Sequence, residues 1–318
     1  MANGKTYVQE RLDPVTSSGP VFARHESFHP RFGWIKKGFD KASEDSSAFI
    51  ADDATVQFGI GKNMVKSVRY WCSAFKVVDE FMESGSRARV SVPSDFGSKL
   101  LSDNGWDPYL EDVGSLWLLH WNLLKPICSA TAWEFAFNHF RYLEFTAEEM
   151  LSAITEYKEI EYPAINTAKS SLKSDVNCLI RMYTPQASNN KAVNEDTLDS
   201  PFVELGLIKQ IGDSKHFAFR VGEKLNLANE ILTACCLEYA SLTTPEARTI
   251  NISELTFGID SPGLIFKLTE TDICHALEMV SNKFDELSIA ETAGLLQLHF
   301  KEEPASLSQV VLNHYYKS

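Results

Sequence analysis

One segment of this chain, residues 24–40, gathers two histidines, an acid and several basic side chains in the sequence RHESFHPRFGWIKKGFD. Glu26 lies between His25 and His29, and such a carboxylate could hold a metal ion or act as a general base. The basic groups nearby could clamp a phosphate. The segment could thus be a catalytic site, a nucleic-acid contact or the polar face of a helix. The candidates are, as catalytic groups, His25, Glu26 and Arg31, and, as phosphate contacts, Arg24, Lys36 and Lys37.

The acids of the sequence DPYLED form a second candidate site. Asp107, Glu111 and Asp112 are spaced so that two of them could share a magnesium ion. A helix N-cap followed by first-turn acids explains the same pattern and is the favoured interpretation. For His25 and Glu26, a polar cluster that ties the N-terminal arm to the core is an equally good alternative. The candidate ligands for Mg²⁺ or Mn²⁺ are Glu26, Asp107, Glu111 and Asp112.

The segment 52–80 has the pattern of a helix-turn-helix. A short helical stretch ends at the sequence FGIG, whose glycines permit a tight turn. The next helix has an apolar face at helical spacing and a basic opposite face, with no acid between residues 59 and 78. Alternating apolar residues at 88–92 predict a strand, so 22–105 would form a winged helix. A solvated charged face on a core helix is the alternative. The expected DNA contacts are Lys62, Asn63, Lys66 and Arg69.

A second helix-turn-helix is predicted over residues 146–185. Thr146 and Glu149 have the spacing of a capping box at the start of its first helix. Its second helix has an apolar face, and the segment 202–222 predicts two strands joined at Gly212-Asp213, which would form a second wing. The expected DNA contacts are Lys169, Lys173 and Arg181.

These segments predict a mainly α fold with small β wings, in which tandem winged-helix units surround a helical hub. The hub is the strongly apolar stretch 106–145, because hydrophobicity on all sides is typical of buried helices. We expect the following organisation: a flexible arm at 1–20, a winged helix with the hub at 21–145, and a second winged helix with a C-terminal helical domain at 146–318, including a polar linker at 186–200. Acids outnumber bases in the last third, which favours packing or partner binding there.

Composition limits the class of protein. The 318 residues are 44% hydrophobic, as in ordinary globular proteins, and the net charge of −13 argues against non-specific coating of nucleic acid. Six cysteines without C-x-x-C spacing indicate buried free thiols. No apolar run is long enough to span a membrane, and the N-terminus has no signal-peptide pattern. We therefore expect a cytoplasmic protein without membrane contact.

Four blocks of the sequence resemble one family. The blocks are, in order, HESFHPRFGWIKKGFD, GIGKNMVKSVRYW, DPYLED with LWLLHW, and SPGLIFKL. Together they are similar to an uncharacterised-domain family of bacterial defence loci that includes the SspB-type DNA nickases of single-strand phosphorothioation systems. The resemblance extends over roughly residues 22–315, which is nearly the whole chain.

The resemblance implies a DNA nickase that acts on duplex DNA beside an ATPase and a sulfurtransferase. In such systems sulfur replaces a non-bridging phosphate oxygen, and a nick would give the modification enzymes access to that phosphate. Two other functions fit the same helices: a non-catalytic DNA-binding adaptor and a transcription regulator of the locus. The sequence contains no established nuclease motif and leaves open whether the protein is a dimer.

Overall fold

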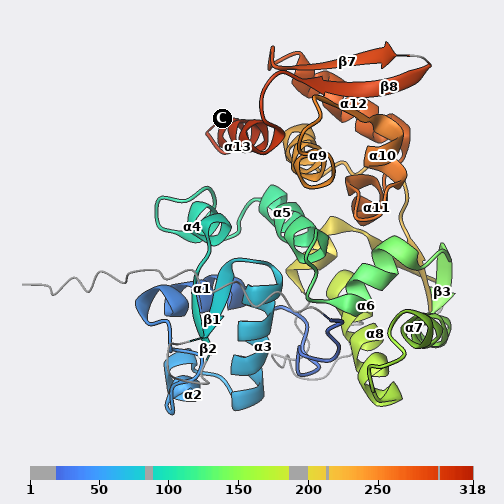
Figure 1. Cartoon of the computed structure of the whole chain (residues 1–318). Helices are drawn as coiled ribbons and strands as arrows, with labels where there is room; N and C mark the ends of the chain where they lie inside the picture. Colours follow the sequence, from blue (N-terminus) through green and yellow to red (C-terminus); the bar gives the residue numbers. More distant parts are fainter. Residues whose placement is uncertain (1–18, 83–88, 186–199, 213–214, 293, 318) are drawn as a thin grey trace, which may run out of the picture.

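The structure, a computed structural model, describes residues 19–82, 89–185, 200–212, 215–292 and 294–317 (Figure 1). Almost all of the predicted arm at 1–20 and linker at 186–200 lies outside these ranges. In the described part of the chain, helices predominate and the strands form three small antiparallel sheets. The predicted fold class, mainly α with small β elements, is confirmed at this level.

The first unit has three helices followed by a strand pair. Its elements are α1 (Trp34–Glu44), α2 (Ala54–Phe58), α3 (Lys62–Ala74), β1 (Val78–Met82) and β2 (Arg89–Pro93). Gly59 ends α2 with φ of 63°, a left-handed conformation that glycine adopts without strain. The predicted short helix, glycine turn and amphipathic helix are therefore present. The strand at 78–82 was not predicted, because its alternation is weak.

The second unit follows the order strand, helix, helix, strand, strand. Its elements are β3 (Glu144–Thr146), α7 (Ala147–Glu161), α8 (Lys169–Tyr183), β4 (Ile208–Ile211) and β5 (His216–Phe219), with the sheet order β3-β5-β4. The predicted capping box is confirmed, since the Thr146 side chain accepts from the backbone N–H of Glu149 and the Glu149 carboxylate accepts from that of Thr146. The two strands predicted around Gly212 also pair as expected.

The third unit, residues 229–316, repeats the topology of the second. Its elements are α9 (Asn229–Thr243), β6 (Thr249–Asn251), α10 (Ile252–Phe257), α11 (Pro262–Phe266), α12 (Glu270–Ser281), β7 (Leu287–Thr292), β8 (Leu295–Phe300) and α13 (Pro304–Tyr315). The sheet order β6-β8-β7 again places the first strand beside the third. The sequence predicted a helical domain in this part of the chain but none of these strands.

The hub between the units is built on the buried helix α5. Its elements are α4 (Asp95–Leu101), α5 (Val113–Leu124), α6 (Thr131–Glu134), the π-helix η1 (Phe135–His139) and the 3₁₀ helix η3 (Pro201–Leu205). Every residue of α5 from Gly114 to Leu124 is buried, which confirms the predicted hub helix. The His120 side chain is also buried there, and its ring nitrogens contact the Tyr183 hydroxyl and the Ile265 carbonyl.

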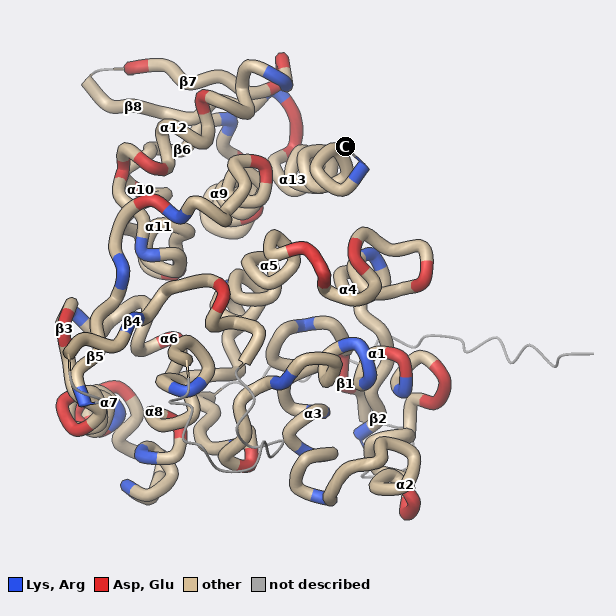
Figure 2. Tube along the Cα trace, turned by 180° about the vertical axis from the view of Figure 1, so that it is seen from behind, with Lys and Arg blue, Asp and Glu red and all other residues tan. Residues whose placement is uncertain are grey.

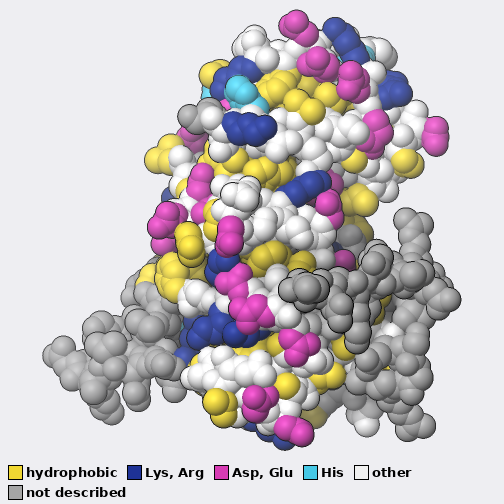
Figure 3. Space-filling model, turned by 90° about the vertical axis from the view of Figure 1, so that its left-hand side faces the viewer, with side chains coloured by type: hydrophobic (Ala, Val, Ile, Leu, Met, Phe, Trp, Pro, Cys, Tyr) yellow, Lys and Arg dark blue, Asp and Glu magenta, His cyan; other side chains and the backbone are white. Residues whose placement is uncertain are grey.

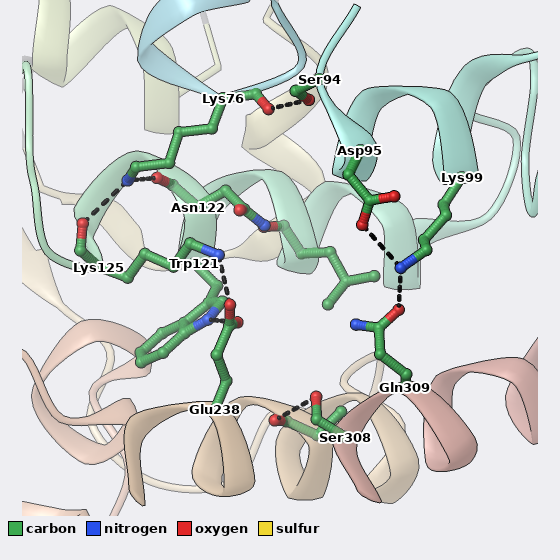
Figure 4. Close-up of polar contacts among 12 residues, drawn as sticks. Lys76, Ser94, Asp95, Lys99, Trp121, Asn122, Lys125, Glu238, Ser308 and Gln309 are labelled. Carbon is green, nitrogen blue, oxygen red and sulfur yellow. Dashed lines mark hydrogen bonds and ion pairs between the residues drawn. The ribbon is translucent and has the colours of Figure 1, made fainter. Parts of the chain in front are cut away.

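Polar side chains connect the hub to the first and third units (Figure 4). The Lys76 ammonium donates to the carbonyl oxygens of Asn122, at 2.5 Å, and Lys125, at 2.9 Å, and burial lowers its pKa to about 8. On the other side, the Trp121 indole and the Lys125 ammonium both donate to the Glu238 carboxylate of α9. The hub therefore holds the two units through buried donors as well as apolar packing.

Two further predictions are tested by the structure. All six cysteines are free thiols, and four of them are fully buried. Among the helices of the described ranges, none combines the length and apolar character that crossing a bilayer requires.

Candidate nucleic-acid interface

The segment 22–31 forms a loop between helices α3 and α8, and we call it the bridging loop (Figure 1). His25 is fully buried in it, with its Nε2 atom 2.7 Å from Oδ1 of Asp175 in α8. The Asp175 carboxylate also accepts from the backbone N–H of Ala23. The His25 ring packs against Trp71 of α3 and Trp133 of α6. This geometry matches a polar cluster that ties the loop to the core, and it leaves the His25 ring no exposed surface.

Further hydrogen bonds fix the bridging loop on both helices. The Trp71 indole donates to the Phe28 carbonyl at 2.9 Å, and the hydroxyls of Ser27 and Ser174 lie 2.9 Å apart. Glu26 and Ser27 have φ of 50° and 65°, left-handed values that cost free energy in residues other than glycine. Such a backbone persists only where its surroundings hold it, so the loop sets the relative positions of α3 and α8.

The buried carboxylate of Asp175 affects its surroundings electrostatically. Tyr70 of α3 packs near His25, with ring centroids 6.3 Å apart. Burial, and secondly the Asp175 charge, raise the pKa of the Tyr70 hydroxyl well above its ordinary value. Tyr70 therefore stays neutral, and its hydroxyl donates to the Ser129 carbonyl of the hub.

Exposed basic side chains lie on both helices and on the loop between them. Helix α3 contains no acid, and the only acid of α8 is the buried Asp175. Figure 2 shows the basic positions of α3 and α8 toward the same end of the molecule. We call this surface the basic face, and its exposed members are Arg24, Lys62, Asn63, Lys66, Lys169, Lys173 and Arg181.

Glu26 is the acid of the bridging loop, and it lies at the surface beside α3. Its Oε1 atom is 3.4 Å from the Lys66 ammonium, and the side chains are 32% and 53% exposed, respectively. An exposed ion pair of this kind contributes little to stability, about 0.5 kcal/mol or less. The carboxylate is thus free to exchange partners and lies where a phosphate group bound to Lys66 would be close.

Three other predicted phosphate contacts already bond within the protein. The Arg69 guanidinium donates to the Glu80 carboxylate at 2.7 Å and to the Arg89 carbonyl at 2.8 Å, which braces the β1–β2 strand pair. Lys36 pairs with Asp40 at 2.6 Å, and Lys37 donates to a backbone carbonyl at the end of α2. These cations would have to exchange partners before they could contact DNA.

The outer side of α1 bears a shallow groove of about 340 Å³ that includes two of these lysines. The Lys36 ammonium lies 5.7 Å from the centre of the exposed Tyr109 ring. Figure 3 shows basic side chains bordered by acidic ones on this side of the molecule. The groove is lined by Gly33, Lys36, Lys37, Asp40, Lys41, Glu44 and Tyr109.

Arg31, a predicted catalytic residue, is buried at 7% exposure. Its guanidinium lies 5.4 Å from the centre of the Phe28 ring and 5.0 Å from that of the Trp34 ring. These contacts hold the end of the bridging loop against α1. The structure therefore brings His25, Glu26 and Arg31 into one loop but exposes only Glu26.

The acids of the DPYLED sequence have the geometry of a capping cluster. The two oxygens of the Asp107 carboxylate accept from the backbone N–H groups of Glu111 and Asp112, both at 3.0 Å. Asp112 caps α5 by accepting from Gly114 and also accepts from the Tyr315 hydroxyl. Across the described ranges, no group of three or more His, Cys, Asp or Glu side chains is arranged to hold a metal ion. The candidate ligands do not form a ready coordination set, so we derive no step through Mg²⁺ or Mn²⁺.

Asp175 is the residue of this site that the sequence analysis missed. It lies three residues after Leu172 and one before Val176, both buried on the apolar face of α8. An acid on an apolar helix face is a signal of a buried partner, because an unpaired buried charge is costly. The sequence could not show that the partner is His25, which lies 150 positions away.

Comparisons with known proteins agree with this architecture. A magnesium ion-bound SspB crystal structure is similar to the chain with a TM-score of 0.89 and 39% sequence identity, covering 94% of this chain and 88% of that chain. An SspB crystal structure has a TM-score of 0.88 with the same identity and coverage. A family model described as "Protein of unknown function (DUF4007)" matches residues 22–316. No curated protein matches the chain. The resemblance inferred from the sequence blocks is confirmed.

Proposed function

The chain belongs to the family described as "Protein of unknown function (DUF4007)", and on this premise we propose that it binds duplex DNA and nicks one strand in a phosphorothioation-based defence system. The observation that supports DNA binding best is the basic face, in which α3 and α8 present exposed cations on either side of a fixed loop. The similarity to SspB structures at 39% identity supports the system.

Two winged-helix units provide the DNA-binding surface in this proposal. In each unit a helix pair, α2–α3 or α7–α8, precedes an antiparallel strand pair. The second helix of a helix-turn-helix is the one that enters the major groove. By this correspondence α3 and α8 are the recognition helices. The bridging loop holds them at a fixed distance, so both contact one duplex without a further ordering cost.

The charge of the basic face suits phosphate. Each cation that neutralises a phosphate releases a counterion, and the slope of log K against log salt changes by about −0.9 per contact. Five exposed cations lie in the bridging loop or in the first five residues of α3 and α8. They predict a slope of log K against log salt of about −4 to −5. They are Arg24, Lys62, Lys66, Lys169 and Lys173.

Glu26 is the general base of the proposed nicking step. Its carboxylate takes a proton from a water molecule, whose oxygen bonds to phosphorus as the bond from phosphorus to one sugar oxygen breaks. The departing oxygen takes a proton from solvent. Lys66 and Arg24 stabilise the extra negative charge at phosphorus, and the buried His25 and Arg31 position the loop. The nick then exposes the phosphate to sulfurtransferase and ATPase partners of the system.

A non-catalytic DNA-binding adaptor is the second candidate. The burial of His25 and Arg31 favours it, because these two side chains cannot reach a phosphate in this conformation. An adaptor would use the same basic face and position partner enzymes on the duplex. Both candidates predict DNA binding, and only the first predicts strand cleavage.

Conversion of supercoiled plasmid to open circles separates the two candidates. The assay compares the purified protein in Mg²⁺, in Mn²⁺ and in EDTA with a Glu26→Gln variant. We expect open circles from the natural protein and at least about a hundredfold slower conversion by Glu26→Gln, as is typical when a general base is removed. Retention of DNA on a gel without any open circles would support the adaptor. Equal cleavage by Glu26→Gln would place the chemistry at another residue.

A further inference from the structure

The third unit has the same topology as the second, but its helix α12 carries the opposite charge to helix α8. Both have a strand, helices and a strand pair, with the first strand beside the third. Helix α12 corresponds to α8, because each is the last α-helix before the strand pair of its unit. Residues 229–318 contain thirteen acids and five Lys or Arg side chains, and α12 itself has three acids and no Lys or Arg. This helix would repel a phosphate backbone, so it cannot take the DNA-binding role that is proposed for α8.

Acids lie on one side of α12, where Glu278 is exposed and Glu270 is partly exposed. Glu270 and Glu278 lie one turn before and one turn after Cys274. Burial is the main cause that raises the pKa of the Cys274 thiol, and the charges of these two acids raise it further. Within the described ranges, neither carboxylate has a basic side chain at ion-pair distance, and the same is true of Glu291 at the end of β7. Asp272, by contrast, is used in a capping box with Thr269.

Exposed apolar side chains accompany these acids. Met279 of α12 is 44% exposed, and Leu296 of β8, on the same face of the sheet as the buried Leu298, is 41% exposed. Helix α12 packs against β7, which pairs with β8 so that Glu291 lies opposite Leu296 (Figure 1). Exposed apolar groups on adjoining elements offer contact area to a partner protein, and the unpaired acids beside them favour a basic partner.

We propose that α12 and the β7–β8 strand pair form a docking surface for a basic, partly apolar helical segment of a partner protein. Charge complementarity selects the occupant: the acids pair with Lys or Arg, and the apolar side chains pack against leucine-like groups. This surface is separate from the basic face, so the protein can hold DNA and a partner protein at the same time. The inference goes beyond the proposed nicking and does not depend on it.

Fluorescence anisotropy with a labelled synthetic helix of leucine and lysine pairs tests this inference. We expect the full chain to bind the peptide, and a Glu278→Lys/Glu291→Lys variant to bind it at least about tenfold more weakly. The matched control is Glu148→Lys/Glu156→Lys, which reverses two exposed acids of α7, and it should change affinity by less than about twofold. A Met279→Ser/Leu296→Ser variant should also bind more weakly, because apolar contact contributes beyond charge.

Three results would overturn the docking surface. They are absence of peptide binding, equal weakening by the two charge-reversed pairs, and no effect of the serine variant. Duplex DNA binding, measured on the same samples, should be the same for the natural protein and the Glu278→Lys/Glu291→Lys variant. A failure of DNA binding by all proteins would count against the proposed function and leave the docking result unaffected.

Discussion

Replacement of Asp175 by alanine tests the role of the bridging loop in the fold. The change removes the acceptor for the Ala23 N–H, at 2.9 Å, and for His25 Nε2, at 2.7 Å. A buried donor left without a partner costs about 1–3 kcal/mol. His25 and Asp175 are 0% and 2% exposed, so water cannot replace the lost acceptor at the histidine, whereas Ala23 is only partly buried. We therefore expect Asp175→Ala to lower the free energy of unfolding by about 3 kcal/mol.

Urea denaturation followed by tryptophan fluorescence measures this loss directly. Trp71 and Trp133 both pack on the His25 ring, so their emission reports on the loop. The matched control is Ser174→Ala, at the position of α8 next to Asp175. It removes only an exposed hydrogen bond to Ser27 and should lower the free energy of unfolding by less than about 0.5 kcal/mol. A loss below about 1 kcal/mol for Asp175→Ala, or an equal loss for the control, would refute the reasoning.

Three further predictions concern single sites. Glu26→Gln should bind duplex DNA at least as tightly as the natural protein in a gel-shift titration, because it releases Lys66; a clear loss of affinity would contradict the assigned role. Gly97→Ala should lower the melting temperature by several degrees in calorimetry, because a Cβ atom there would lie 2.0 Å from the Val77 carbonyl oxygen; an unchanged temperature would count against this packing. Burial lowers the pKa of Lys267 from 10.5 to about 7. Between these two pH values Lys267 is protonated in the unfolded chain but not in the folded one, so the free energy of unfolding rises with pH in this range. Urea titrations should therefore show that the free energy of unfolding rises less between pH 7 and pH 9 in Lys267→Met than in the natural protein. An equal rise in the two proteins would exclude this pKa shift.

The local features of the fold were predictable from the sequence. The glycine turn before α3, the capping box of α7 and the apolar face of α8 depend on residues a few positions apart. The buried hub helix α5 was also predictable, because it is apolar on all sides. Such patterns reflect backbone preferences and helical spacing, which the chain expresses without reference to distant segments.

The contacts that join these elements were not predictable. His25 and Asp175 meet across 150 positions, and nothing near either residue identifies the other. The sheet of the third unit was missed because β6 has only three residues and β7 is largely exposed, which leaves little apolar alternation. Likewise, the sequence indicated Arg69 as a DNA contact, whereas in the structure its guanidinium braces the β1–β2 pair.

The central claim is that α3 and α8 bind one duplex together. Anisotropy of a labelled duplex measures it most directly. The assay compares Lys62→Glu/Lys173→Glu with Lys301→Glu/Lys317→Glu, which reverses two exposed lysines, one directly after β8 and one after α13. We predict that the first pair lowers the salt slope by about 2 and weakens binding far more than the control pair. Equal affinity and equal salt slope for the two variants would contradict the account.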